Sequence, residues 1–134
     1  MRSSLLLAAA FALATTASHA GDLADANAAF DHKDYATAFA LYQPLAKSGT
    51  AEAQSAIGAM YFFGNGIAKN PSRAYMWFDL AARSPSPVAT VAATNREIVR
   101  RQMAASEIRD ADAMAAQCLS SRYEQCGLTH FAAR

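Results

Sequence analysis

Residues 50–84 have the sequence TAEAQSAIGAMYFFGNGIAKNPSRAYMWFDLAARS, which predicts two short helices folded back on each other around a turn. Small and apolar residues recur at three- and four-residue spacing, the period of an amphipathic helix, on both sides of a break at Gly64 and Gly66. Little side chain separates the two backbones, so we expect close packing with aromatic rings filling the gaps. The residues at this spacing are Ala53, Ile57, Gly58 and Tyr61 in the first helix and Ala74, Trp77, Phe78, Ala81 and Ala82 in the second.

The limits of the second helix are marked by prolines and a capping residue. Asn70 can accept a hydrogen bond from the first turn, and Pro71 follows it at a position where its missing N–H costs nothing. Pro85 and Pro87 cannot continue a helix and bias the preceding residues toward extended geometry. We therefore expect this helix to begin near Pro71 and to end by about Ser84.

The same segment resembles the Sel-one-like repeat, whose pattern is A-x-A-Q-x-x-[LI]-G-x-x-Y, then G-x-G-[IV]-x-K-[DN], then A-x-x-W-[FY]-x-x-A-A. The resemblance implies an all-α, tetratricopeptide-like, right-handed solenoid of helix pairs that serves as a non-catalytic scaffold for protein–protein contacts. The matching residues are Ala51, Ala53, Gln54, Ile57, Gly58, Tyr61, Gly64, Gly66, Ile67, Lys69, Asn70, Ala74, Trp77, Phe78, Ala81 and Ala82.

A single hairpin cannot bury its own apolar face, so neighbouring helix pairs are expected on both sides. Upstream, residues 22–30 predict a short helix, and Tyr35, Ala38, Tyr42, Leu45, Ala46 and Gly49 repeat the second-helix pattern. Downstream, residues 89–103 and 106–120 predict two alanine-rich helices that lack the paired glycines and the tryptophan. We expect one domain of about three helix pairs over residues 21–120, with a clear repeat at 50–84, degenerate flanking pairs and a tail at 121–134.

The first twenty residues have the pattern of a secretory signal peptide. Arg2 precedes the apolar run of residues 5–14, and Ser18-His19-Ala20 supplies small residues for cleavage before Gly21. The apolar run is too short to span a membrane, which needs about 20 residues, so no stable span is expected after cleavage. The pattern predicts export and hence a periplasmic or secreted protein.

The charge balance argues against nucleic acid as a partner. The chain has 12 basic and 11 acidic residues, and loss of Arg2 would leave the two equal. Such a balance provides no electrostatic attraction to an acidic polymer. Nothing in the sequence indicates a cofactor.

If the chain is exported, we expect Cys118 and Cys126 to form a disulfide, because an oxidising compartment favours a disulfide over free thiols. One unbroken helix would hold the two Cα atoms about 12 Å apart, too far for a bridge, so a bonded pair requires the helix to end near Ser120-Ser121. The spacing is also similar to the bridge of cysteine-rich members of the family. A zinc site with His130 is the alternative, but it lacks the usual fourth ligand and C-x2-4-C start.

Motifs of enzyme chemistry were not found. The chain contains no G-x-S-x-G elbow, S-x-x-K pair, H-E-x-x-H motif or phosphate-binding glycine loop. Some cysteine-rich relatives have been linked to β-lactam binding or hydrolysis, but no serine or threonine here has a visible base to activate it. We predict no enzyme activity, no catalytic residues and no metal site.

Contact with a partner is expected on the concave face, which solenoids build largely from the first helix of each pair. Ser55, Phe62 and Phe63 on the first helix and Tyr75 on the second lie off the packing stripe, and aromatic residues are enriched at binding hot spots. Arg96 and Arg100, with Arg101, form a second candidate. The alternatives are that the rings pack against neighbouring hairpins and that the arginines form a solvated surface.

The expected partner is another envelope protein or peptide in the solenoid groove. Binding of peptidoglycan or regulation of the cell wall is the alternative, and a β-lactam hydrolase-like activity is a further one. Self-association that extends the solenoid is also possible for so short an array of repeats.

Overall fold

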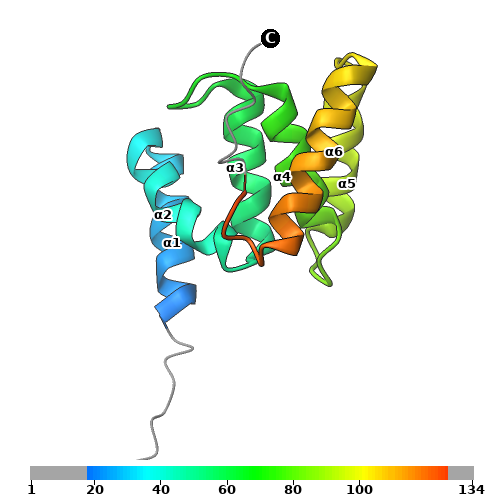
Figure 1. Ribbon diagram of the computed structural model, residues 1–134. Coiled ribbons are helices and arrows are strands. Elements are labelled where there is room, and N and C mark those ends of the chain that lie inside the picture. Colours follow the sequence, from blue (N-terminus) through cyan, green and yellow to red (C-terminus); the bar gives the residue numbers. More distant parts are fainter. Residues whose placement is uncertain (1–17, 127–134) are drawn as a thin grey trace, which may run out of the picture.

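The computed structural model describes residues 18–126, and its regular elements are six helices in chain order (Figure 1). Within these residues there is no strand, and the all-α prediction is confirmed. The helices are α1 (Ser18–Asp31), α2 (Tyr35–Lys47), α3 (Ala51–Phe63), α4 (Pro71–Ala82), α5 (Ala89–Arg100) and α6 (Ala105–Ser120).

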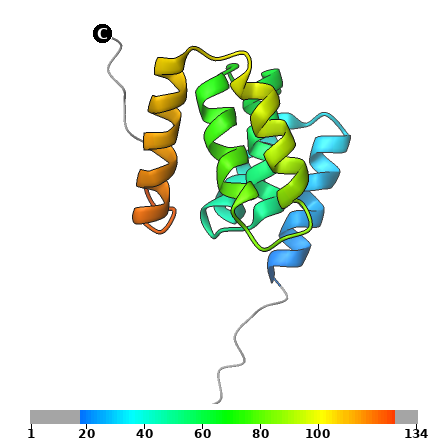
Figure 2. The same ribbon diagram turned by 90° about the vertical axis from the view of Figure 1, so that its right-hand side faces the viewer.

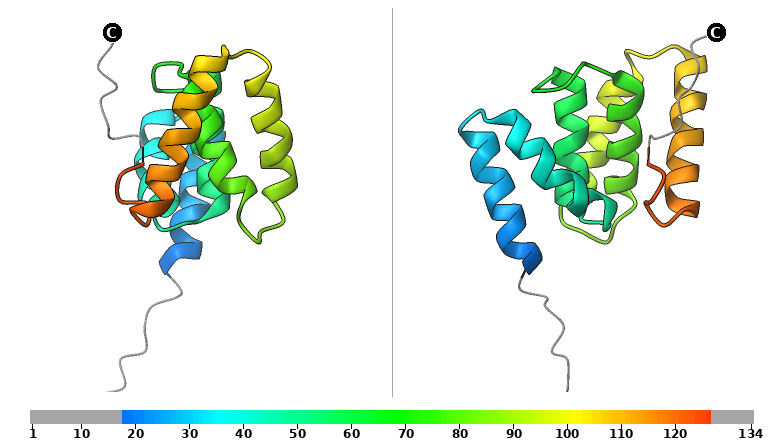
Figure 3. Two further views of the ribbon diagram at one scale, coloured as in Figure 1. Left: turned by 45° about the vertical axis from the view of Figure 1, so that its right-hand side comes forward. Right: turned by 60° about the vertical axis from the view of Figure 1, so that its left-hand side comes forward.

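The helices follow one another across the molecule, from α1 at one edge to α6 at the other (Figure 3). The most extensive packing joins α3 to α4, α4 to α5, α1 to α2 and α2 to α3. The last pair differs from the others, because α5 and α6 pack on opposite sides of α4 rather than extensively on each other (Figure 2). The fold is a solenoid of helix pairs with a splayed final pair.

The central hairpin forms for the local reasons that the sequence indicates. The Asn70 side chain accepts a hydrogen bond from the backbone N–H of Arg73 at 2.9 Å, and Pro71 is the first residue of α4. Gly64 ends α3 in the left-handed conformation, with φ +75°, and donates its N–H to the Met60 carbonyl at 2.8 Å. Helix α4 ends at Ala82, before the first proline, so its predicted limits are confirmed.

Helix α4 is the centre of the hydrophobic core. All residues from Ala74 to Ala81 are buried, because α3, α5 and α6 cover three sides of the helix. Close approach of α3 depends on Gly58, since a Cβ at that position would lie 3.0 Å from the Phe78 ring. The predicted contact of small against aromatic residues is therefore present.

The flanking helices agree with the sequence apart from their ends. Helix α2 has Asp34 as its N-cap, and the Tyr42 hydroxyl donates a 2.6 Å hydrogen bond to the Asn27 side chain of α1. Burial raises the pKa of Tyr42, and the nearby Asp31 carboxylate adds to this effect. Helix α5 ends at Arg100, earlier than predicted, because residues 101–104 form the turn that leads into α6.

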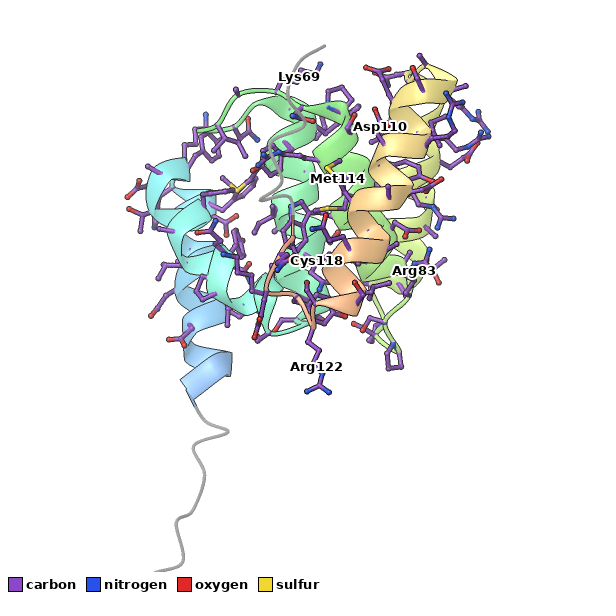
Figure 4. The ribbon with its side chains drawn as sticks, viewed as in Figure 1. Lys69, Arg83, Asp110, Met114, Cys118 and Arg122 are labelled. Atoms are coloured by element: carbon purple, nitrogen blue, oxygen red, sulfur yellow. A yellow bond between two sulfur atoms is a disulfide. The ribbon has the colours of Figure 1, made fainter. Side chains whose placement is uncertain are left out.

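A disulfide joins Cys118 and Cys126, with the two Cα atoms 4.3 Å apart. Helix α6 ends at Ser120, between the two cysteines, as the bridge requires. The turn after it is fixed by a 2.7 Å hydrogen bond from the Tyr123 N–H to the Cys118 carbonyl, and the Tyr123 ring lies against Gly49. Arg122 points away from the fold (Figure 4). The disulfide thus closes the turn after α6, and Tyr123 of this turn contacts Gly49 between α2 and α3.

Two expectations lie wholly or mainly outside the described residues. The predicted signal peptide falls on residues 1–17 and on the first three residues of α1, and the last part of the tail falls on residues 127–134. In the part of the chain that the structure describes, no helix is both long enough and apolar enough to cross a membrane.

Gly66 provides a stability test of the central turn. Its φ is +71°, and a Cβ there would lie 2.6 Å from the Tyr35 Cβ, whereas Gly64 has a similar φ but more open surroundings. We expect Gly66→Ala to lower the free energy of unfolding by about 3 kcal/mol, the sum of backbone strain and overpacking. Gly64→Ala should cost only about 1 kcal/mol, the strain alone. Equal losses in urea denaturation would show that contact with Tyr35 is unimportant.

Candidate functional site

The outward face of α3 forms the floor of a groove. Small side chains lie along it, at Ser55, Ala56 and Ala59. They line a hollow of about 270 Å³, with Phe30 and Tyr42 of the first pair on one side. The remaining lining residues are Glu52 and Val88. The groove forms where short side chains of α3 lie beside larger side chains of its neighbours.

A second, more enclosed hollow continues the groove toward the C-terminal end of α3. Its volume is about 170 Å³, and it shares Ala59 with the first hollow, so the two are adjacent along one helix. From Glu52 to Phe63 this face extends about 16 Å, at about 1.5 Å of rise per residue. The lining residues are Ala59, Phe62, Phe63, Phe78, Asn95, Ile98 and Val99.

Helix α5 supplies the second wall, which the sequence analysis did not identify. Asn95 and Ile98 line the enclosed hollow, and Val91 lies on the same face of the helix at the spacing i, i+4, i+7. Val91 is 59% exposed and Ile98 is 47% exposed, unusual for large apolar side chains. This spacing is visible in the sequence, but only the packing of α5 on α4 shows that the face borders α3.

The structure places Ser55, Phe62 and Phe63 in the groove. The Phe62 and Phe63 rings meet edge to face, with centroids 4.9 Å apart, and Phe63 is 68% exposed. The Lys69 ammonium lies 5.5 Å from the centroid of the Phe62 ring. Figure 4 shows Lys69 in the loop above the end of α3. This end of the groove therefore combines an exposed aromatic pair with a cation.

Tyr75 is not a surface residue, which corrects its selection as a binding candidate. The side chain is 6% exposed and lies in the interface of α4 and α6. Burial raises its pKa, and a hydrogen bond to Asp112 of α6 contributes further. The neighbouring positions Met76 and Asp79 of α4 are buried as well.

Arg96 holds two helices together instead of facing a partner. Its Nη1 lies 2.6 Å from Oδ1 of Asp79, and Arg83 Nε lies 2.7 Å from Oδ2 of the same carboxylate. Asp79 is 2% exposed, so the two guanidinium groups neutralise a charge in the core. This correction gives Arg96 a positioning role, because its ion pair fixes α5, and with it the groove wall, on α4.

Arg100 and Arg101 remain at the surface and share one carboxylate. Arg100 forms a bidentate pair with Glu97, at 2.7 and 2.9 Å, and Arg101 lies 3.3 Å from Glu97 Oε1. The hydrogen bond from Arg100, supported by Arg101, lowers the pKa of Glu97 to about 2. Two cations therefore face one anion, which leaves this turn of α5 with an excess positive charge.

Residues 18–126 contain no cluster of side chains that could bind a metal ion. Within them, no three His, Cys, Asp or Glu side chains come together as a metal site would require, and His130 of the zinc alternative lies outside this range. Both cysteines of that alternative are bonded to each other.

Part of the chain matches the model of a known protein family. The family model of the Sel1 repeat matches residues 33–50 and 51–86, which correspond to α2 and to the α3–α4 hairpin. The chain contains Sel1 repeats. No curated protein and no solved structure matches it. Sel1 repeats generally mediate protein–protein interaction, and proteins that contain them are typically non-catalytic scaffolds.

The structure gives three of the Sel1 positions a clear physical task. Gly58 admits the Phe78 ring, Gly64 ends α3, and Gln54 donates from Nε2 to the Ala46 carbonyl at 3.1 Å. That last bond ties the complete Sel1 repeat to the partial repeat before it. These Sel1 positions thus build the scaffold, whereas the groove is lined mostly by residues that are not part of the Sel1 pattern.

Asp79 can be tested as the link between scaffold and groove. We expect Asp79→Asn to lower the free energy of unfolding by about 1–3 kcal/mol, since both arginines lose their charged partner but can still turn toward water. Hydrogen exchange should increase in α5 more than in α1. Glu97→Gln is the matched control, because it removes an exposed carboxylate that also pairs with two arginines, and it should change the melting temperature little. Equal effects of the two variants would contradict a special role of Asp79.

Proposed function

We propose that this Sel1-repeat protein is an exported scaffold of the cell envelope that binds a segment of another protein in the groove along α3. The observation that carries the proposal is the exposure of Phe63 and Ile98 around a floor of small side chains. Large apolar residues that remain exposed beside a concave surface are typical of interaction sites. The small floor residues would let the backbone of a bound segment approach α3 closely.

The geometry suits a short peptide segment. A face of about 16 Å accommodates roughly three turns of a helix at about 5.4 Å per turn. Helices bind in such grooves through apolar side chains spaced three and four residues apart. The predominantly apolar lining favours a protein partner over peptidoglycan, for which a more polar groove is expected.

Export is supported by two independent features. Residues 1–20 have the composition of a signal peptide, and Cys118 and Cys126 are bonded, as is common in oxidising compartments. A hydrolase finds less support. Ser55 lies in the groove, but its hydroxyl forms no hydrogen bond to a base within the described part of the chain.

Affinity capture from an envelope extract tests the groove. We expect the wild-type chain to retain a partner that the Phe63→Ala, Ile98→Ala variant loses, because truncation of two central apolar contacts typically costs more than 1 kcal/mol each, about a tenfold loss of affinity or more. Mass spectrometry identifies the retained proteins.

The matched control is Leu119→Ala, which truncates an exposed apolar side chain on α6, outside the groove. It should retain the same partner as the wild type. Circular dichroism establishes that all variants are folded. If the groove variant and the wild type capture the same proteins, the groove is not the binding site.

The location is tested separately by fusing residues 1–20 to a reporter enzyme that is active only after export. We expect activity outside the cytoplasm and loss of that activity when Leu6 and Leu7 are replaced by Arg, because charges interrupt the apolar region that the export machinery recognises. A reporter that remains inactive would refute export while leaving the groove proposal intact.

A further inference from the structure

The groove does not have the same chemistry at its two ends. At the start of α3, the Glu52 carboxylate accepts a 2.9 Å hydrogen bond from the Ser86 hydroxyl, so this end is acidic. At the other end, the enclosed hollow of about 170 Å³ has room for one large apolar side chain. Phe63 and Ile98 line this hollow and are exposed large apolar residues.

Two cations lie next to residues that line the enclosed hollow. Lys69 Nζ lies over the Phe62 ring, and Lys69 forms no ion pair with any residue of the described range. On the α5 side, Arg101 lies beside Ile98 in a shallow hollow on the outer surface of the helix. Its side chain is 76% exposed, and it shares the Glu97 carboxylate with Arg100, which holds that carboxylate by two hydrogen bonds. Two incompletely neutralised positive charges thus lie next to Phe62 and Ile98, two residues that line the hollow.

Asn95 adds a polar group inside the apolar lining. Its side-chain amide takes part in no hydrogen bond among residues 18–126, although the residue lines the hollow. An amide offers both donors and an acceptor, so it can pair with a backbone N–H or C=O of a segment that lies across the groove. A few polar groups of this kind fix the orientation of a ligand in an otherwise apolar site.

We propose that the enclosed hollow receives a large apolar side chain of a partner protein whose segment carries an Asp or Glu close to that residue. The acidic side chain lies toward Lys69 or Arg101, and the segment runs along α3 toward Glu52. This assignment rests on the proposed function and adds the chemistry of the partner to it. Charge complementarity carries it: a carboxylate would balance the excess charge at this end, whereas a basic residue would be repelled.

Selection from a peptide library tests the assignment. Random twelve-residue peptides displayed on phage are selected on the purified full chain with its disulfide intact. We expect enrichment of a large apolar residue with an Asp or Glu within four positions of it. Binding of the best peptide, labelled with fluorescein, is then measured by fluorescence polarisation.

Charge reversal provides the decisive comparison. The Lys69→Glu, Arg101→Glu variant should bind the selected peptide about tenfold more weakly, as two exposed charge pairs allow. It should prefer the same peptide with its acidic residue changed to Lys. The Arg109→Glu, Arg122→Glu variant makes the same change in net charge away from the groove and should bind like the wild type.

The outcomes separate this inference from the proposed function. If no peptide is enriched, or if enriched peptides bind the Phe63→Ala, Ile98→Ala variant as well as the wild type, the groove proposal itself fails. If peptides need Phe63 and Ile98 but contain no acidic residue and tolerate the charge reversal, the groove stands and the acidic partner is refuted. A loss of affinity equal to that of the control variant also overturns the charge assignment.

Discussion

Enclosure of α4 is the constraint on which the other helices depend. Its residues 74–81 are all buried, with α3 on one side and α5 and α6 on two others. A helix covered in this way has no polar face, so the amphipathic stripe typical of a surface helix is replaced by apolar residues around its circumference. The one charged residue inside, Asp79, must then be neutralised locally, and Arg83 and Arg96 do so.

The groove is a consequence of that enclosure. Because α5 packs on α4 beside α3, one face of α3 is left between two walls, and its small residues form the floor. Gly58 has a matching effect where α3 packs on α4, because it brings α3 close to Phe78. The Arg96–Asp79 pair then connects the core to the wall, so a change inside α4 can alter the width of the groove. Scaffold and candidate site are therefore coupled through one buried carboxylate.

Helix α6 and the turn that follows it are stabilised by a different means. Helix α6 packs on α4 but not extensively on α5, and no further helix pair follows it within the described residues. The disulfide and the contact of Tyr123 with Gly49 compensate by fastening the end of α6 near the turn between α2 and α3. A covalent bridge is an effective way to secure a small domain whose terminal helices have few neighbours.

The sequence by itself determined the presence of the helices and the limits of the central hairpin. Asn70 with Pro71, the glycines at 64 and 66, and Pro85 act through hydrogen bonds and backbone geometry within a few residues, so their effect does not depend on the rest of the fold. The same holds for the requirement that α6 end between its cysteines. Ser55, Phe62 and Phe63 could be placed on the open face of α3 from helical spacing alone.

Only the tertiary structure decided which of the remaining candidates reach the groove. Tyr75 and Arg96 were both candidates for binding, yet Tyr75 is buried between α4 and α6 and Arg96 pairs with Asp79. Asn95 and Ile98 face the groove because α5 packs on α4 at a particular angle, and no local pattern encodes that angle. The physical reason is the same in each case: exposure of a helix face depends on neighbours that are distant in sequence, whereas the helix itself depends on residues close by.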